Sequence, residues 1–237
     1  MPNTADVVQI RDLRFAWPGA RADVLVLPAL NLKAGKRYFL HGPSGCGKST
    51  LLGLMAGVLM PRQGRVELLG QDWSRLPPAK RDRRRAEHVG VIFQQFNLLP
   101  YLSCLDNVLL PCELSAARAA RCGRSALDEA HRLLQSMELP QALWQRRADA
   151  LSIGQQQRVA AARALIGRPR LVIADEPTSA LDEPLRDTFM ALLMGECRQA
   201  DGTLVFVSHD KRLASHFDES LSLQALQALQ ALPEPAP

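Results

Sequence analysis

Residues 42–49, Gly-Pro-Ser-Gly-Cys-Gly-Lys-Ser, have the types and spacing of a loop that binds phosphate groups. The glycines allow a tight curl in which successive backbone N–H groups point at phosphate oxygens, and the following helix adds its positive N-terminal dipole. We expect Lys48 to reach the β- and γ-phosphates and the Ser49 hydroxyl to bind Mg²⁺. The predicted nucleotide-binding residues of this loop are Gly42, Pro43, Ser44, Gly45, Cys46, Gly47, Lys48, Ser49 and Thr50.

Three predicted strands end in polar side chains that suit the hydrolysis of a triphosphate. These side chains are Gln94, Asp175 with Glu176, and His209. Because ligands lie at the carboxyl ends of the strands in an open parallel sheet, we expect them to face one nucleotide. Asp175 would stand behind Mg²⁺, and Glu176 would polarise the attacking water as general base. Gln94 would contact Mg²⁺ or that water, and His209 would hydrogen-bond the γ-phosphate and orient the base.

A second predicted anion site lies at residues 151–165, where a serine and a glycine open a helix. Ser152 is a natural N-cap, and Gly154 leaves the first turn open to an anion. One domain cannot easily close two anion sites on the same γ-phosphate. We therefore predict a head-to-tail dimer in which Ser152 and Gly154 of one chain face the phosphate loop of the other.

The elements that position these residues alternate between strands and helices, which predicts a mainly parallel α/β sheet. Between about Leu105 and Arg168 the chain is rich in Ala, Arg, Leu and Gln with helical periodicity, so a helical subdomain is inserted before the strand that leads to Asp175. Pro28 interrupts its own strand, which is therefore expected to be irregular or at a sheet edge. A further helix is predicted from Pro184 to Gln199. The predicted strands cover residues 7–17, 24–32, 37–41, 64–70, 89–94, 170–174 and 202–208.

The C-terminal Gln-Ala-Leu repeat from Leu221 to Gln230 predicts a short helix that Pro233 stops. We interpret it as a frayed terminal decoration without a role.

The composition excludes a disordered chain, because 47% of the 237 residues are hydrophobic and 22% are charged. No apolar run reaches the roughly 20 residues of a membrane span, and the start lacks the features of a signal peptide, so we expect a cytosolic protein. The net charge of +5 comes largely from residues 80–85 and 118–124, which favour solvated helix faces over a nucleic-acid or lipid surface. The five cysteines, odd in number and without a Cys-x-x-Cys pair, predict neither a disulfide framework nor a zinc site.

Taken in this order, the motifs resemble the nucleotide-binding subunit of an ABC transporter, and the likeness covers about residues 7–218. The resemblance implies ATP as the nucleotide, Mg²⁺ held by Ser49, Gln94 and Asp175, and catalytic roles for Glu176, His209, Lys48 and Gln94. Trp17 stands where the family places an adenine-stacking aromatic residue, usually tyrosine, whereas Phe15 is assigned to the core. The matching segments are the phosphate loop at 42–49, the Q-loop at Gln94, the signature at 151–155, the Walker B strand at 171–176, the D-loop at 179–182 and the switch residue His209.

The resemblance implies a single nucleotide-binding domain with the α/β fold of P-loop NTPases. Its RecA-like catalytic core with an antiparallel β subdomain would comprise residues 1–95 and 169–218. The inserted α-helical signature subdomain would comprise residues 96–168, and residues 219–237 would form the C-terminal tail.

One residue departs from the family pattern, because Ile153 replaces the usual first glycine of the signature. In the family, the serine and the second glycine make the contact to the partner's nucleotide, and these are Ser152 and Gly154 here. We expect that contact to persist, with Ile153 affecting the tightness of closure and the rate of hydrolysis.

Residues 93–100 and the compact length are similar to the branch with MacB, LolD and FtsE type subunits. That similarity implies a homodimer bound peripherally to a separate integral membrane permease of the MacB or FtsX kind, on the cytoplasmic side of a bacterial inner membrane. It favours export, lipoprotein release or mechanotransmission, with no nucleic-acid partner. The alternatives are a soluble ABC-type ATPase acting on nucleic acid or the ribosome, and a different P-loop enzyme such as a small-molecule kinase, against which the signature and His209 argue.

Overall fold

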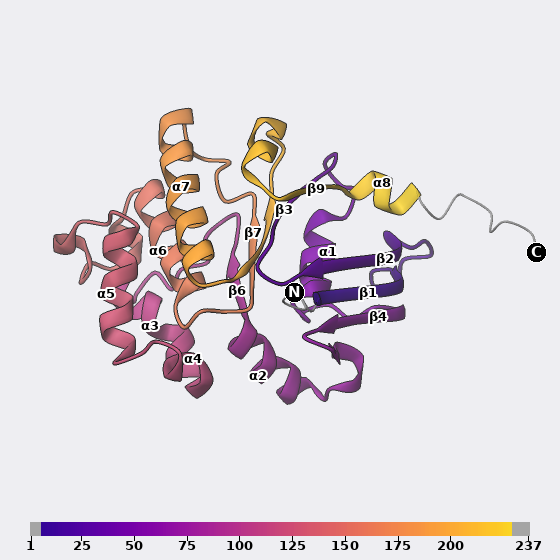
Figure 1. Ribbon diagram of the computed structural model, residues 1–237, viewed down its shortest axis with the longest axis horizontal. Coiled ribbons are helices and arrows are strands. Elements are labelled where there is room, and N and C mark those ends of the chain that lie inside the picture. The colour runs from indigo at the N-terminus through magenta and orange to yellow at the C-terminus, as the bar shows by residue number, and fades with distance from the viewer. Residues whose placement is uncertain (1–5, 229–237) are drawn as a thin grey trace, which may run out of the picture. The chain divides into compact units, whose positions relative to one another are not determined.

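The computed structural model describes residues 6–228, which divide into two compact units (Figure 1). The first unit runs to Arg85 and resumes at Val205, and the second runs from Ala86 to Leu204. Helix α2 (Pro78–His88) and strand β8 (Thr203–Val207) cross the two boundaries. The first unit contains β1 (Asp6–Phe15), β2 (Leu25–Lys33), β3 (Arg37–His41), α1 (Lys48–Met55), β4 (Gln63–Leu68), β5 (Gln71–Asp72), β9 (Glu219–Ser222) and α8 (Leu223–Ala228). The second contains β6 (Val89–Ile92), α3 (Cys104–Leu114), α4 (Ala116–Ala120), α5 (Ala126–Ser136), α6 (Ile153–Leu165), β7 (Leu171–Asp175) and α7 (Glu183–Gln199).

The antiparallel sheet of the first unit has the strand order β2-β1-β4-β5. Pro28 lies on β2, the edge strand, as predicted, because proline has no N–H to offer a second neighbour. Several side chains of β1, including Val8, Ile10 and Leu13, are completely buried and build the core of this unit, and a register shift between Arg11 and Arg14 separates Ile10 from Leu13 by three residues. Trp73 is also fully buried, and its indole Nε1 donates to the Met55 carbonyl at 3.1 Å, which fixes the end of α1.

Strand β3, which leads into the phosphate loop, pairs in parallel with β9, with Tyr38 opposite Glu219. The pair is locked at its start by Arg37, whose Nε and Nη2 donate to the two carboxylate oxygens of Asp218 at 2.8 and 2.6 Å. The interpretation of the C-terminal segment as a frayed decoration is therefore wrong for residues 219–228. Residues 219–222 form a strand rather than part of a helix, and Leu223 is fully buried.

The second unit contains the predicted helical region, where α3, α4, α5 and α6 precede β7. The run Val159-Ala160-Ala161-Ala162 of α6 is completely buried, since small side chains let neighbouring helices approach. Strands β6 and β7 pair in parallel from Val89 opposite Leu171 to Ile92 opposite Ala174. Within residues 6–228, no helix combines the length and apolar character needed to cross a membrane.

The basic run at residues 118–124 is solvated only in part, contrary to expectation, because Arg124 is exposed but Arg118 is buried. Arg118 is 2% exposed, and its guanidinium donates to the carbonyls of Ala164 and Ile166 at the end of α6 and of Val89 on β6. Burial lowers the pKa of Arg118 to about 10, so it remains charged at neutral pH. Arg118 therefore caps carbonyls at a helix C-terminus, a role that helical periodicity does not reveal.

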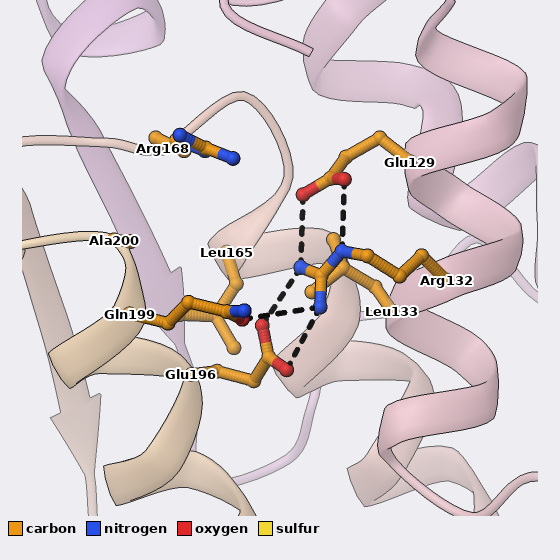
Figure 2. A pocket seen from close by; sticks show the side chains of 8 residues that line it. All are labelled: Glu129, Arg132, Leu133, Leu165, Arg168, Glu196, Gln199 and Ala200. Atoms are coloured by element: carbon orange, nitrogen blue, oxygen red, sulfur yellow. Dashed lines mark hydrogen bonds and ion pairs between the residues drawn. The ribbon is translucent and has the colours of Figure 1, made fainter. Parts of the chain in front are cut away.

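An ion-pair network joins α5 to α7 within the second unit. Figure 2 shows the guanidinium of Arg132 between the carboxylates of Glu129 and Glu196, at 2.9 and 2.8 Å. Burial alone would raise the pKa of Glu196, but hydrogen bonds from Arg132 and Ser136 bring that pKa below its ordinary value. Because the charges of Arg132, Glu129 and Glu196 satisfy one another, we interpret this ion-pair network as a structural link between helices α5 and α7.

Candidate nucleotide site

The phosphate loop joins β3 to α1 in the first unit and has the backbone that its glycines predict. Gly45 and Gly47 adopt φ values of 77° and 100°, a region that other residues enter at a cost. Lys48 is buried, and its Nζ donates to the carbonyls of Gly42 and Pro43 at 3.0 Å each, so the amine lies across the loop. A Cβ at Gly42 would come within 2.8 Å of Cys46 Sγ, so a larger residue there would crowd the loop. This cradle, with a helix N-terminus behind it, fits a chain of phosphate groups.

Trp17 lies where the chain leaves β1, and 46% of its side chain is exposed. It meets Phe15 edge-on, with 5.1 Å between ring centroids, whereas Phe15 is 5% exposed and belongs to the core, as predicted. The Val24 N–H donates to the Phe15 carbonyl at 2.8 Å, and a Cβ at Gly47 would meet Leu25 and the Val24 carbonyl at 3.4 and 3.6 Å. The strand end that carries Trp17 therefore adjoins the phosphate loop.

His209 also belongs to the first unit, where it follows β8 and is exposed. His209 lies inside a turn that begins at Ser208, because the Asp210 N–H donates to Ser208 Oγ at 3.1 Å. That turn fixes the backbone on both sides of His209.

The C-terminal helix α8 touches the phosphate loop, a contact that the sequence analysis missed. Gln227 Nε2 donates to the Cys46 carbonyl at 3.3 Å, and a Cβ at Gly42 would lie 3.6 Å from Leu223 Cβ. The Gln-Ala-Leu repeat carried a usable signal, since leucines and glutamines three residues apart fall near one helix face.

In the second unit, the parallel pairing of β6 and β7 brings two predicted groups to one sheet edge. Ile92 stands opposite Ala174, so Gln94 and the pair Asp175–Glu176 leave adjacent strands in the same direction. Glu176 has φ 47°, which costs a residue with a side chain on the order of 1 kcal/mol and is concentrated at functional sites. The Ser179 N–H donates to the Glu176 carbonyl at 3.2 Å and closes the turn that holds this conformation.

The signature segment opens α6 in the same unit with a complete capping box. Ser152 is the N-cap, Gln155 N–H donates to its Oγ at 3.4 Å, and Gln155 Oε1 accepts from the Ser152 N–H at 3.0 Å. Ile153 is the first helical residue and 57% exposed, so the fold accommodates it without burying it. A Cβ at Gly154 would have only Leu181 nearby, at 3.9 Å, so this helix start is open.

Two residues of α6 that the sequence analysis did not select hold functional segments of the second unit. Gln157 bonds the carbonyl of Pro177, and Arg163 bonds the carbonyls of Phe96 and Asn97. Both are polar side chains beside a buried run of small apolar residues, and that pattern was the available signal.

Cysteine alkylation provides a test of the loop assignment. Cys46 is partly exposed, whereas Cys112 and Cys122 are buried with their sulfurs 3.5 Å apart, and burial raises the pKa of Cys112 to about 12. At pH 8 only about one Cys112 thiol in ten thousand would be the reactive thiolate. Iodoacetamide should therefore modify Cys46 and abolish ATP binding, and ATP should protect it. Peptide mass spectrometry that finds Cys112 modified first would contradict this expectation.

A strand, a glycine loop closed by lysine and serine, and a strand-end Asp–Glu pair define an ATP-hydrolysing P-loop protein. The ABC transporter family matches residues 28–179 of the chain. The chain belongs to this family, as an ATP-binding and ATP-hydrolysing component, and the kinase and nucleic-acid alternatives find no support in the relatives.

Curated relatives and a solved structure extend the likeness over nearly the whole chain. The lipoprotein-releasing system ATP-binding protein LolD of Anaeromyxobacter dehalogenans is 41% identical over 94% of this chain and 92% of its own length. The macrolide export ATP-binding/permease protein MacB of Rhodopirellula baltica is 37% identical over 92% of this chain, which spans only 32% of that longer relative. The structure of the ATP-binding cassette MJ0796, described as a dimeric post-hydrolysis state bound to ADP and Pi, superposes with a TM-score of 0.80 at 31% identity, covering 91% of this chain and 93% of that one.

Proposed function

We propose that two copies of this chain bind ATP head to tail and that hydrolysis in this dimer drives a separate membrane permease. The observation that carries the proposal is the open helix start at Ser152 and Gly154, which would serve as a second anion-binding element in a chain that already has a phosphate loop. The dimeric ADP- and Pi-bound state of MJ0796 supports it by likeness.

In each composite site, residues of one chain would bind and hydrolyse ATP. Lys48 and the loop N–H groups would neutralise the β- and γ-phosphates, and Trp17 would stack on the adenine. Glu176 would accept a proton from the attacking water, while His209 would hydrogen-bond the γ-phosphate and hold the base in position. Ser152 and Gly154 would come from the partner and complete the enclosure of the γ-phosphate.

Mg²⁺ fits the same donor set, since hydroxyl, amide and carboxylate oxygens are the ligands it prefers. Ser49, Gln94 and Asp175 would hold it, and Ser49 is exposed at the start of α1 as this role requires. The cation would neutralise charge on the β- and γ-phosphate oxygens when bound.

We assign the chain as one functional nucleotide-binding domain, with its catalytic core and β subdomain at 1–95 and 169–218, its helical subdomain at 96–168 and its tail at 219–237. The chain would lie peripherally on the cytoplasmic face of a bacterial inner membrane, where its partner would be an integral permease of the MacB or FtsX kind. The relatives named for lipoprotein release and macrolide export are 41% and 37% identical and support export or extraction, although a relative named for spermidine/putrescine import is 34% identical over 99% of this chain.

Size-exclusion chromatography of the purified chain with and without ATP tests the dimer, and affinity purification from detergent-solubilised membranes tests the partner. We expect an ATP-dependent dimer, ATPase activity that rises more steeply than protein concentration, and co-purification of a permease with few spans and a large extracytoplasmic domain. Turnover by a monomer would contradict the dimer. Salt-sensitive retention of nucleic acid with no permease would favour the soluble ATPase instead.

A further inference from the structure

Arg163, near the C-terminal end of the signature helix α6, holds the turn that carries Gln94. Its Nη1 donates to the Asn97 carbonyl at 2.7 Å and its Nη2 to the Phe96 carbonyl at 2.6 Å. Phe96 and Asn97 have φ values of 59° and 49°, so two successive residues occupy the left-handed region. A guanidinium has the fork geometry to hold both carbonyls at once. The conformation after Gln94 therefore depends on a residue of the signature helix.

The placement of Arg163 carries a desolvation cost that arginines at the surface do not have. Burial lowers the pKa of its guanidinium, which means that the charge has lost solvation. The two carbonyl hydrogen bonds offset that loss, as charge-assisted hydrogen bonds are stronger than neutral ones. These hydrogen bonds suit Arg163 to holding the backbone of Phe96 and Asn97 in one conformation.

Gln157, in the middle of α6, holds the turn that carries Glu176. It is 1% exposed, and its Nε2 donates to the carbonyl of Pro177, the residue after Glu176, at 2.6 Å. Glu176 is itself in the left-handed region, so this bond supports a strained backbone at the predicted base.

The same helix begins with the signature, so one rigid element joins three functional segments of the second unit. Helix α6 is continuous from Ile153 to Leu165, and Arg163 lies about 16 Å along its axis from the Ser152 N-cap. We propose that Gln157 and Arg163 are positioning residues, which couple engagement of Ser152 and Gly154 by the partner's nucleotide to the placement of Glu176 and Gln94 in their own chain. The proposal rests on the head-to-tail dimer, and it adds a physical connection through helix α6 between the two nucleotide sites of that dimer.

Three single variants of α6 test the coupling. Arg163→Lys keeps the positive charge but loses the paired N–H groups of the guanidinium. Gln157→Met keeps the side-chain volume but loses the Nε2 hydrogen-bond donor. Arg158→Lys is the matched control, because Arg158 lies on the same helix but donates to Met137 and Glu138, away from both turns.

We expect Arg163→Lys and Gln157→Met each to lower kcat about tenfold, because each variant loses one or two strong hydrogen bonds. The KM for ATP should stay within about twofold of the wild-type value. Amide hydrogen exchange should rise in a peptide spanning 94–98 only for Arg163→Lys, and in one spanning 176–180 only for Gln157→Met. The control should match the wild type in kcat and in both peptides. If one test variant fails to fold, the kcat and hydrogen exchange of the other variant decide whether the coupling exists.

Equal kcat and exchange in the test variants and the control would overturn the coupling, as would a rise in exchange spread over the whole unit. Failure of the wild type to dimerise with ATP would instead overturn the proposed function. The two failures are therefore distinguishable in one series.

Discussion

Glutamine at position 176 is expected to lower the ATP turnover number about a thousandfold while leaving ATP binding intact. Glu176→Gln removes the group that accepts the proton from water and keeps a side chain of the same shape on the turn. Because the phosphate loop is untouched, the nucleotide should still bind and draw two chains together. The variant should therefore accumulate as an ATP-bound dimer.

Single-turnover hydrolysis and size-exclusion chromatography with ATP measure the two halves of this expectation. Glu183→Gln is a suitable control, because it removes the same charge at the start of α7, where the Glu183 carboxylate forms an ion pair with Arg186 at 3.1 Å and its side chain is 63% exposed. It should hydrolyse at the wild-type rate. Normal turnover by Glu176→Gln would show that another group accepts the proton.

The predicted site residues that lie in short motifs follow from local backbone rules. The phosphate loop could be predicted because its turn needs a left-handed backbone that favours glycine, and Gly45 and Gly47 adopt that backbone. Gln94 and Asp175 could be placed at one edge because parallel strands end together, and the pairing of Ile92 with Ala174 has that register.

The contacts that the sequence did not reveal join residues far apart in the chain. Arg118 bonds carbonyls 46 and 48 positions away, and Arg163 bonds carbonyls 66 and 67 positions away. A charged run is equally compatible with a solvated face and with a buried helix cap until its neighbours are known. Tertiary partners, rather than composition, decide between those two roles.

In the C-terminal segment, too, the sequence alone did not reveal a strand that forms through tertiary contacts. Residues 219–222 have little β-propensity of their own, yet they pair with β3, and ion pairs of Arg37 with Asp218 and of Lys36 with Glu219 lie at the start of this pairing. The Gln-Ala-Leu pattern predicted a helix, and α8 occupies residues 223–228 of it. The remaining residues of the predicted helix, 229–230, lie outside the described part of the chain.

The second large effect concerns the partner's half of the site. Gly154→Asp places a carboxylate at the open start of α6, where it would repel the γ-phosphate of the partner's ATP and occupy the N–H groups meant for it. ATP binding by the monomer should be unchanged, because the phosphate loop is intact. Hydrolysis should fall by more than about a hundredfold, since neither site of a dimer of two Gly154→Asp chains can close on its γ-phosphate. Ile153→Gly, the matched neighbour, should alter the rate far less.

Mixing two inactive variants tests whether the two halves lie on different chains. A Lys48→Ala chain lacks the phosphate-loop amine, and a Gly154→Asp chain lacks the signature contact. In a mixed dimer one site carries both defects, while the other combines the intact loop of one chain with the intact signature of its partner. Random pairing of equal amounts should restore about a quarter of wild-type activity, because half of the dimers are mixed and each has one complete site. If each chain used its own signature, every site would carry one defect, and mixing would restore no ATPase activity.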